Sequence, residues 1–147
     1  MGTNVICQIG LVVRDIERSA KAYADVFGME MPKIIVTDPE ELAHTKFRGA
    51  STHARAKLAF FKMGQLSLEL IEPVGEPSTW KEFLDAHGEG VHHIAFQVEG
   101  MDQVLEFLEG KGISVVQRGD YTGGRYSYVG SAPVLGVIIE LLESVRS

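Results

Sequence analysis

The sequence contains a single cysteine, Cys7, and therefore cannot form a disulfide bond within the chain. A lone cysteine fits a reducing compartment, so we expect a cytoplasmic protein. No apolar run approaches the roughly 20 residues that a membrane-spanning helix needs. The first residues also lack the charged and apolar regions of a signal peptide. The composition thus gives no support for a secreted or membrane-embedded protein.

Positive charge is also scarce, because 14 lysine and arginine residues stand against 20 aspartate and glutamate residues, for a net charge of −6. An acidic chain is a poor match for nucleic acid or for an anionic membrane surface, so we expect neither as a partner. Hydrophobic residues make up 45% of the 147 residues. This is enough to form the core of one domain or of two small fused modules.

The hydrophobic pattern predicts the same order of elements twice, namely strand, helix, strand, strand and strand. In the first half we expect a strand at 5–13, a helix at 16–27, and strands at 32–36, 56–63 and 65–71, with a long loop at 37–55. In the second half we expect a strand at 90–98, a helix at 101–109, and strands at 113–117, 126–129 and 134–142. The prediction is an α+β fold of two tandem βαβββ modules, 1–75 and 90–147, joined by a linker at 76–89 that holds a short helix.

The repeat can be followed at the level of single residues. The segment QIGLVV at 8–13 matches HIAFQV at 93–98, and LELIE at 68–72 matches IELLE at 139–143. These matches pair Gln8 with His93 and Glu69 with Glu140. A carboxylate in an apolar strand is costly unless it is paired, protonated or bound to a cation. Four donor side chains at repeat-related positions therefore predict one divalent metal site, and mixed nitrogen and oxygen ligands suit Zn, Ni, Co or Mn.

The strand at 90–98 carries two adjacent histidines, His92 and His93. Side chains alternate along a strand, so we expect the two rings on opposite sides of the sheet. The match with Gln8 selects His93 as the ligand. His92 is then expected to support the site from behind or to face the solvent.

These residues resemble the vicinal oxygen chelate superfamily, also called the glyoxalase/bleomycin-resistance/dioxygenase fold. The closest similarity is to methylmalonyl-CoA epimerases, through the segments 8–15, 69–73, 88–96 and 136–141. The resemblance implies that the two modules form a curved mixed sheet around a metal-binding cavity. It also implies a homodimer and a small-molecule substrate, either an acyl-CoA thioester or a thiol conjugate.

Two departures from the epimerases keep a second branch of the superfamily open. Epimerases usually carry histidine where this chain has Gln8, and glutamine there is instead similar to the ligand set of some zinc glyoxalase I enzymes. Some epimerases also place a catalytic glutamate in the strand that corresponds to 56–61, whereas this chain has no carboxylate from 43 to 68. The glyoxalase I (lactoylglutathione lyase) reading therefore stands beside the epimerase reading.

The predicted chemistry is abstraction of a proton next to a carbonyl group. The metal accepts two adjacent substrate oxygens and stabilises the enediolate. We expect Glu140 to be the base, with Glu69 as the other candidate, since a desolvated carboxylate has a raised pKa. Proton return to the other face of the same carbon gives an epimerase, and proton return to the neighbouring carbon gives a lyase.

Three basic residues are weaker candidates for contact with an anionic part of the substrate. Arg55 and Lys57 lie in the acid-free segment 43–65, and Arg125 lies in a glycine turn at 121–125 that we expect to act as a mobile flap. A solvated loop is the plainer interpretation of the segment 43–65.

Two further alternatives exist for this fold. A drug-binding protein without catalysis typically lacks the metal ligands, and a ring-cleaving dioxygenase uses two histidines and one glutamate on Fe(II).

Overall fold

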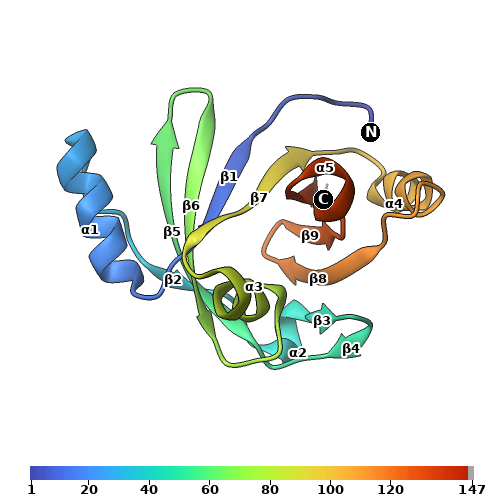
Figure 1. Cartoon of the computed structure of the whole chain (residues 1–147), viewed down its shortest axis with the longest axis horizontal. Coiled ribbons are helices and arrows are strands. Elements are labelled where there is room, and N and C mark those ends of the chain that lie inside the picture. Colours follow the sequence, from blue (N-terminus) through green and yellow to red (C-terminus); the bar gives the residue numbers. More distant parts are fainter. Residues whose placement is uncertain (146–147) are drawn as a thin grey trace.

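A ten-stranded mixed sheet runs through both halves of the chain in the strand order β2-β5-β6-β1-β7-β10-β9-β8-β3-β4 (Figure 1). The computed structural model describes residues 1–145. The first half contributes β1 (Gln8–Val12), α1 (Ile16–Phe27), β2 (Ile35–Val36), α2 (Glu40–Ala43), β3 (Lys46–Phe47), β4 (Ala50–Ser51), β5 (Arg55–Met63) and β6 (Leu66–Val74). The second half contributes α3 (Thr79–His87), β7 (Gly90–Gln97), α4 (Met101–Glu109), β8 (Val115–Tyr121), β9 (Gly124–Val129), α5 (Ala132–Leu135) and β10 (Ile138–Ser144).

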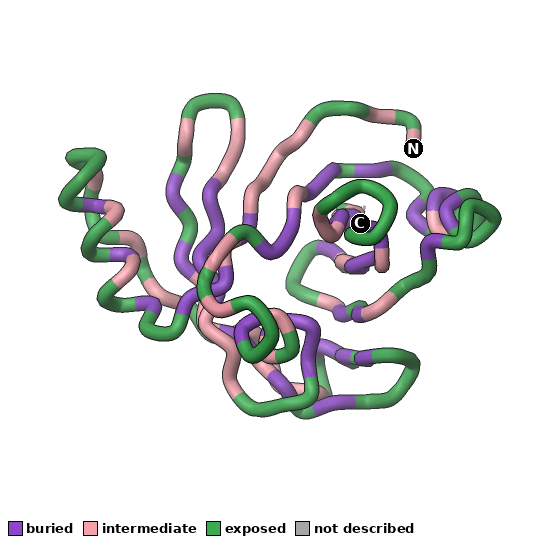
Figure 2. Tube along the Cα trace, in the orientation of Figure 1, coloured by how far each residue is buried: buried purple, intermediate pink, exposed green. Residues whose placement is uncertain are grey.

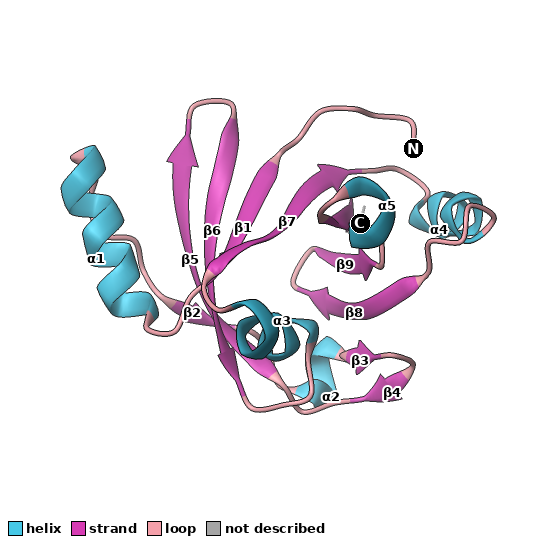
Figure 3. Cartoon of the chain, viewed as in Figure 1, coloured by secondary structure: helices cyan, strands magenta, loops and turns pink. Residues whose placement is uncertain are grey.

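The pairing of the strands repeats between the two halves. β1 runs parallel to β6, β7 runs parallel to β10, and the antiparallel pair β1–β7 joins the halves at the centre of the sheet. The sheet curls, and α1 and α4 lie at opposite ends of the molecule (Figure 3). The expected α+β fold with a curved mixed sheet is thus confirmed. Among residues 1–145, no helix is long and apolar enough to cross a membrane.

Equivalent carboxylates bind the first residue of α1 and the first residue of α4. In the first half, Glu72 of β6 accepts a hydrogen bond from the backbone N–H of Ile16 at 2.9 Å. In the second half, Glu143 of β10 accepts one from the backbone N–H of Met101 at 2.7 Å. A negative charge is favourable at a helix N-terminus, where backbone donors have no partner within the helix. The sequence match of 68–72 with 139–143 is therefore also a match in structural role.

Three clusters of buried residues form the core. Figure 2 shows buried residues along the strands and within the helices. One cluster lies under α1, through Ile16, Ala20 and Ala24, and a second lies under α4, through Met101, Val104 and Leu108. The third joins the halves and includes Trp80 and Leu84 of α3 with Tyr128 of β9. The third cluster is the one that adjoins the site described below.

The segment 37–55 differs from the long loop that we expected. It contains α2, β3 and β4, and β3 pairs with β8 of the second half, with Lys46 opposite Arg118. The guanidinium of Arg48 also binds the Glu82 carboxylate at 2.8 Å. Elements of two to four residues show no hydrophobic period, so the sequence could not reveal them. The division into modules at 75/76 and 89/90 stays a prediction, since this segment of the first half is built into the sheet of the second.

Residues 134–142 also differ from the single strand that we expected, because α5 occupies 132–135 before β10 begins. Gly136 ends this helix with a φ of 82°, which favours glycine. Ser131 then links the two elements, as its hydroxyl accepts from the N–H of Ile139 and donates to the carbonyl of Val137, both at 2.8 Å.

The pairing of β1 with β7 contains a bulge. Gly10 lies opposite His93 and Leu11 lies opposite Val91, so His92 is the additional residue. A bulge interrupts the alternation of side chains, and the Nδ1 atoms of His92 and His93 are 2.9 Å apart. The expectation that the two rings lie on opposite sides of the sheet was therefore wrong.

Gly10→Ala is expected to lower the free energy of unfolding by about 1–3 kcal/mol, the usual cost of overpacking a filled core. A Cβ atom at position 10 would lie 2.1 Å from Cε1 of the buried His93 ring. Gly90→Ala, on the paired strand, is the matched control, because a Cβ atom there meets no atom within 4 Å. Urea unfolding measures both variants, and equal stabilities would contradict the close approach of β1 to the ring.

Candidate metal centre and cavity

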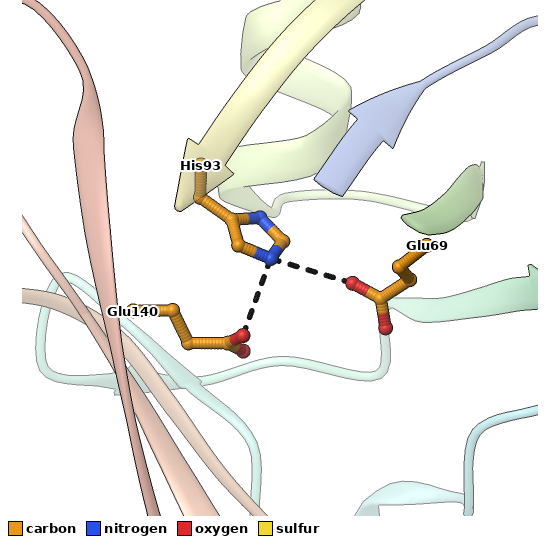
Figure 4. A group of neighbouring side chains, drawn as sticks. All are labelled: Glu69, His93 and Glu140. Atoms are coloured by element: carbon orange, nitrogen blue, oxygen red, sulfur yellow. Dashed lines mark ion pairs between the residues drawn. The ribbon is translucent and has the colours of Figure 1, made fainter. Parts of the chain in front are cut away.

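Three ionisable side chains from three central strands meet at one point (Figure 4). Glu69 comes from β6, His93 from β7 and Glu140 from β10, and all three are buried. The His93 Nε2 atom lies 3.4 Å from Glu69 Oε1 and 3.2 Å from Glu140 Oε1. One donor atom from each residue lies within 4.8 Å of the other two. The pairing of β6, β1, β7 and β10 as neighbours brings these side chains together.

Gln8 of β1 completes the group. Its Oε1 atom lies 3.3 Å from the same His93 Nε2 atom. The four side chains that the repeat matched in the sequence therefore surround one ring nitrogen. Whether each of them is a metal ligand stays a prediction.

The oxygens at this point outnumber the donors. A single N–H on Nε2 faces three oxygen atoms, and within residues 1–145 the Oε1 atoms of Glu69 and Glu140 are buried without a hydrogen-bond partner. Buried polar atoms nearly always have partners, so this pair marks a site that a cation would satisfy. One imidazole nitrogen with carboxylate and amide oxygens is a donor set that fits Zn, Ni, Co or Mn.

The charges of the group act strongly on one another. Burial alone would lower the pKa of His93, but the carboxylates of Glu140 and Glu69 outweigh it and raise this pKa to about 9. Burial raises the pKa of Glu69, and the charge of Glu140 adds to that increase. Without a metal ion, a proton on His93 thus supplies one positive charge beside the two carboxylates.

His92 forms the next link behind His93. Its Nδ1 faces His93 Nδ1 at 2.9 Å and its Nε2 lies 3.2 Å from the hydroxyl of Thr79. Burial, together with the charge of His93, lowers the pKa of His92, so the ring is neutral. His92 then accepts from the Nδ1–H of His93 and keeps its own proton on Nε2, facing Thr79. Such a hydrogen bond fixes the orientation of a histidine whose other nitrogen binds a metal.

A cavity of about 460 Å³ opens onto the group. Gln8, Glu69 and Glu140 line it, together with the aromatic side chains of Trp80, Tyr126 and Tyr128. The Tyr128 ring also lies 5.0 Å from the rings of both His92 and His93. A volume of this size, an apolar wall and a few polar groups are typical of a small-molecule site.

Two tyrosines of the cavity have partners that can only donate. The Nε1–H of Trp80 donates to the Tyr128 hydroxyl at 3.1 Å. Gln117 donates to the Tyr126 hydroxyl through Nε2 at 3.1 Å, since its Oε1 is occupied by the N–H of Thr79. Burial raises the pKa of both tyrosines, so each hydroxyl keeps a proton that it can donate to a ligand.

Sequence reasoning missed these tyrosines, although one signal was available. Residues 126 and 128 stand on one face of a strand, because side chains alternate along it. The hydrophobic pattern predicts the strand at 126–129 but does not assign its faces.

The three basic residues that are candidates for substrate contact have other partners. The Nε of Arg55 donates to the carbonyl of Thr37 at 2.8 Å, and the Nζ of Lys57 lies 3.5 Å from Glu72. Arg125 binds Glu143 at 2.7 Å. None of the three is among the described residues that line the cavity. The turn at 121–125 joins β8 to β9, and its Tyr121 and Thr122 do line the cavity; a role for the three cations in substrate binding stays a prediction.

The chain is similar to known proteins in sequence and in fold. The chain is 26% identical over 143 residues to the uncharacterized protein YqjC of Bacillus subtilis (strain 168). The aligned region covers 95% of this chain and 92% of that protein. Its fold is similar to that of the Streptomyces coelicolor methylmalonyl-CoA epimerase in complex with 2-nitronate-propionyl-CoA. The TM-score is 0.66 and the identity 24%, over 97% of this chain and 96% of that one.

A methylmalonyl-CoA epimerase in complex with methylmalonyl-CoA and NH4+ gives a similar result. The TM-score is 0.65 and the identity 25%, over 96% of this chain and 94% of that one. Residues 7–129 match a family model, and by this match the chain belongs to the Glyoxalase/Bleomycin resistance protein/Dioxygenase superfamily.

Proposed function

We propose that this chain is a metal-dependent isomerase that abstracts a proton next to a carbonyl group, with an acyl-CoA thioester as substrate, as in methylmalonyl-CoA epimerases. The observation that carries the proposal is the pair of buried carboxylates, Glu69 and Glu140, that flank one histidine nitrogen at a cavity. The likeness in fold to two methylmalonyl-CoA epimerases supports it. Glu69, His93 and Glu140, with Gln8 beside them, are the residues that would hold the ion.

Each residue of the site has a proposed task. When bound, a divalent ion supplies positive charge to two adjacent substrate oxygens while negative charge develops on them. The Glu140 carboxylate takes the proton from the substrate carbon, with Glu69 as the other candidate. The hydroxyls of Tyr126 and Tyr128 donate hydrogen bonds to the substrate oxygens. His92 holds the ring of His93 in place through the contact between their Nδ1 atoms.

A glyoxalase I activity is the second candidate, and Gln8 is the observation that favours it. Its amide oxygen lies 3.3 Å from His93 Nε2, so glutamine occupies the fourth position of the group. The same base could serve both reactions, which differ in the carbon that receives the proton. A binding protein without catalysis is disfavoured, because ligand binding alone does not require two buried carboxylates whose Oε1 atoms lack hydrogen-bond partners within residues 1–145. A homodimer stays a prediction from the resemblance.

Protein purified without chelator is expected to contain about one divalent ion per chain. Removal of the ion with EDTA should lower Tm by several degrees, because a ligand that binds only the folded state stabilises it. Added Zn²⁺ or Co²⁺ should restore the Tm of the wild type but leave that of His93→Ala unchanged. His53→Ala, which removes an exposed histidine, should respond as the wild type does. A protein that is purified without metal, and whose Tm does not change when Zn²⁺ or Co²⁺ is added, would contradict the proposal.

His92→Leu is expected to weaken metal affinity about 10- to 100-fold, as loss of the group that orients a ligand usually does. His92→Asn keeps an acceptor near the position of Nδ1 and should recover much of that affinity. A competition titration against a chromophoric chelator measures both variants, and circular dichroism checks their fold. Equal affinities for His92→Leu and the wild type would remove His92 from the mechanism.

Glu140→Gln is expected to lower kcat about 10²- to 10⁴-fold, the usual contribution of a general base. Methylmalonyl-CoA and the hemithioacetal of methylglyoxal should be assayed side by side. Uptake of solvent deuterium at the reacting carbon detects proton abstraction whichever product forms. Glu41→Gln, at an exposed position of α2, is the control and should keep full activity. If both variants still hold one ion per chain and Glu69→Gln abolishes deuterium uptake while Glu140→Gln does not, the base is Glu69.

A further inference from the structure

The ionised groups on the cavity wall are all negative. The lining contains the carboxylates of Asp38, Glu69, Asp120 and Glu140, and among the described residues no lysine, arginine or histidine lines it. A bound divalent ion would neutralise Glu69 and Glu140. Asp38 and Asp120 lie outside that cluster and would keep their charge.

The two outer carboxylates differ in their surroundings. Asp120 lies 2.9 Å from His44 Nδ1 and 3.9 Å from the guanidinium of Arg118. Asp38 is half-buried and has no ion-pair partner among the residues that the structure describes. Within residues 1–145, no ion pair offsets the charge of Asp38 directly, although Arg55 binds the carbonyl of the adjacent Thr37. We therefore expect Asp38 to repel anions more strongly than Asp120 does.

The rest of the wall is apolar. Side chains of β2, β5 and β10 contribute Ile35, Val36, Leu58, Phe60 and Leu142. Ile35, Val36 and Phe60 remain 42%, 48% and 40% exposed, which is high for large hydrophobic side chains. A ligand body that covers them gains the free energy of removing apolar surface from water.

We infer that this cavity selects substrates whose body beside the chelating oxygens is apolar or neutral, and that it rejects anionic bodies. The inference rests on the proposed function, because the chelating end of the substrate is placed at the Glu69–His93–Glu140 group. The pantetheine arm of an acyl-CoA thioester is neutral and meets this requirement when the phosphates stay outside. A glutathione conjugate, which carries two carboxylates and one ammonium group, does not meet it.

Two hydroxamates that share one chelating head test the inference. Benzohydroxamate carries a neutral phenyl body, and 4-carboxybenzohydroxamate adds one negative charge to it. Titration of the Co²⁺-loaded protein with each, followed through the visible spectrum of the ion, gives two dissociation constants. We expect the neutral probe to bind about tenfold more tightly, the size of effect that one nearby carboxylate exerts on a charge.

The variants locate the cause of that preference. Asp38→Asn should reduce the ratio of the two dissociation constants severalfold, and Asp120→Asn should reduce it less. Glu41→Gln removes the same charge from an exposed position of α2 and should leave the ratio unchanged. Equal binding of both probes by the wild type, or a ratio that Asp38→Asn does not alter, would overturn the inference alone. Failure of the protein to bind Co²⁺, or of both probes to perturb its spectrum, would overturn the proposed function and the inference with it.

Discussion

The arrangement of the surrounding elements depends on two carboxylates that are buried beside one imidazole. Glu69 and Glu140 sit in central strands of the sheet, and their Oε1 atoms face His93 Nε2 at 3.4 and 3.2 Å. A fold pays heavily for such groups unless a proton or a metal ion compensates them. The surrounding elements serve this arrangement: the absence of a side chain at Gly10 makes space for the ring, and the bulge at His92 brings a second histidine behind it.

The sequence predicted the group of four because the repeat carried spatial information. The match of Gln8 with His93 and of Glu69 with Glu140 shows that each pair occupies equivalent positions in its strands. Because these strands are neighbours in the sheet, the four side chains come into contact. The bulge could not be predicted, because the alternation of side chains assumes a regular strand register. No residue in the segment GVHHIAF indicates that this register is interrupted. The short elements in 37–55 escaped for a different reason. They owe their form to pairing with β8, a contact far away in the sequence.

The cavity combines two environments that the sequence shows only separately. Its inner end is polar and crowded with acceptors, whereas β2 and β5 provide an exposed apolar wall. If the proposed substrate binds with an apolar body against this wall, water would leave the polar end and the electrostatic interactions there would strengthen. Tyr126 and Tyr128, held by Gln117 and Trp80, stand in this cavity as neutral donors. In this view the apolar wall also favours the chemistry of the polar end.

The equivalent roles of Glu72 and Glu143 bear on how the two halves of the chain can differ. Each half anchors its own helix through a carboxylate at the end of its own last strand, independently of the site. The residues that line the cavity therefore do not have to anchor the helices. One half can carry glutamine where the other carries histidine without any change in its scaffold. A duplicated unit with this division of labour can diversify its chemistry by exchanging single side chains, while both copies keep the same framework.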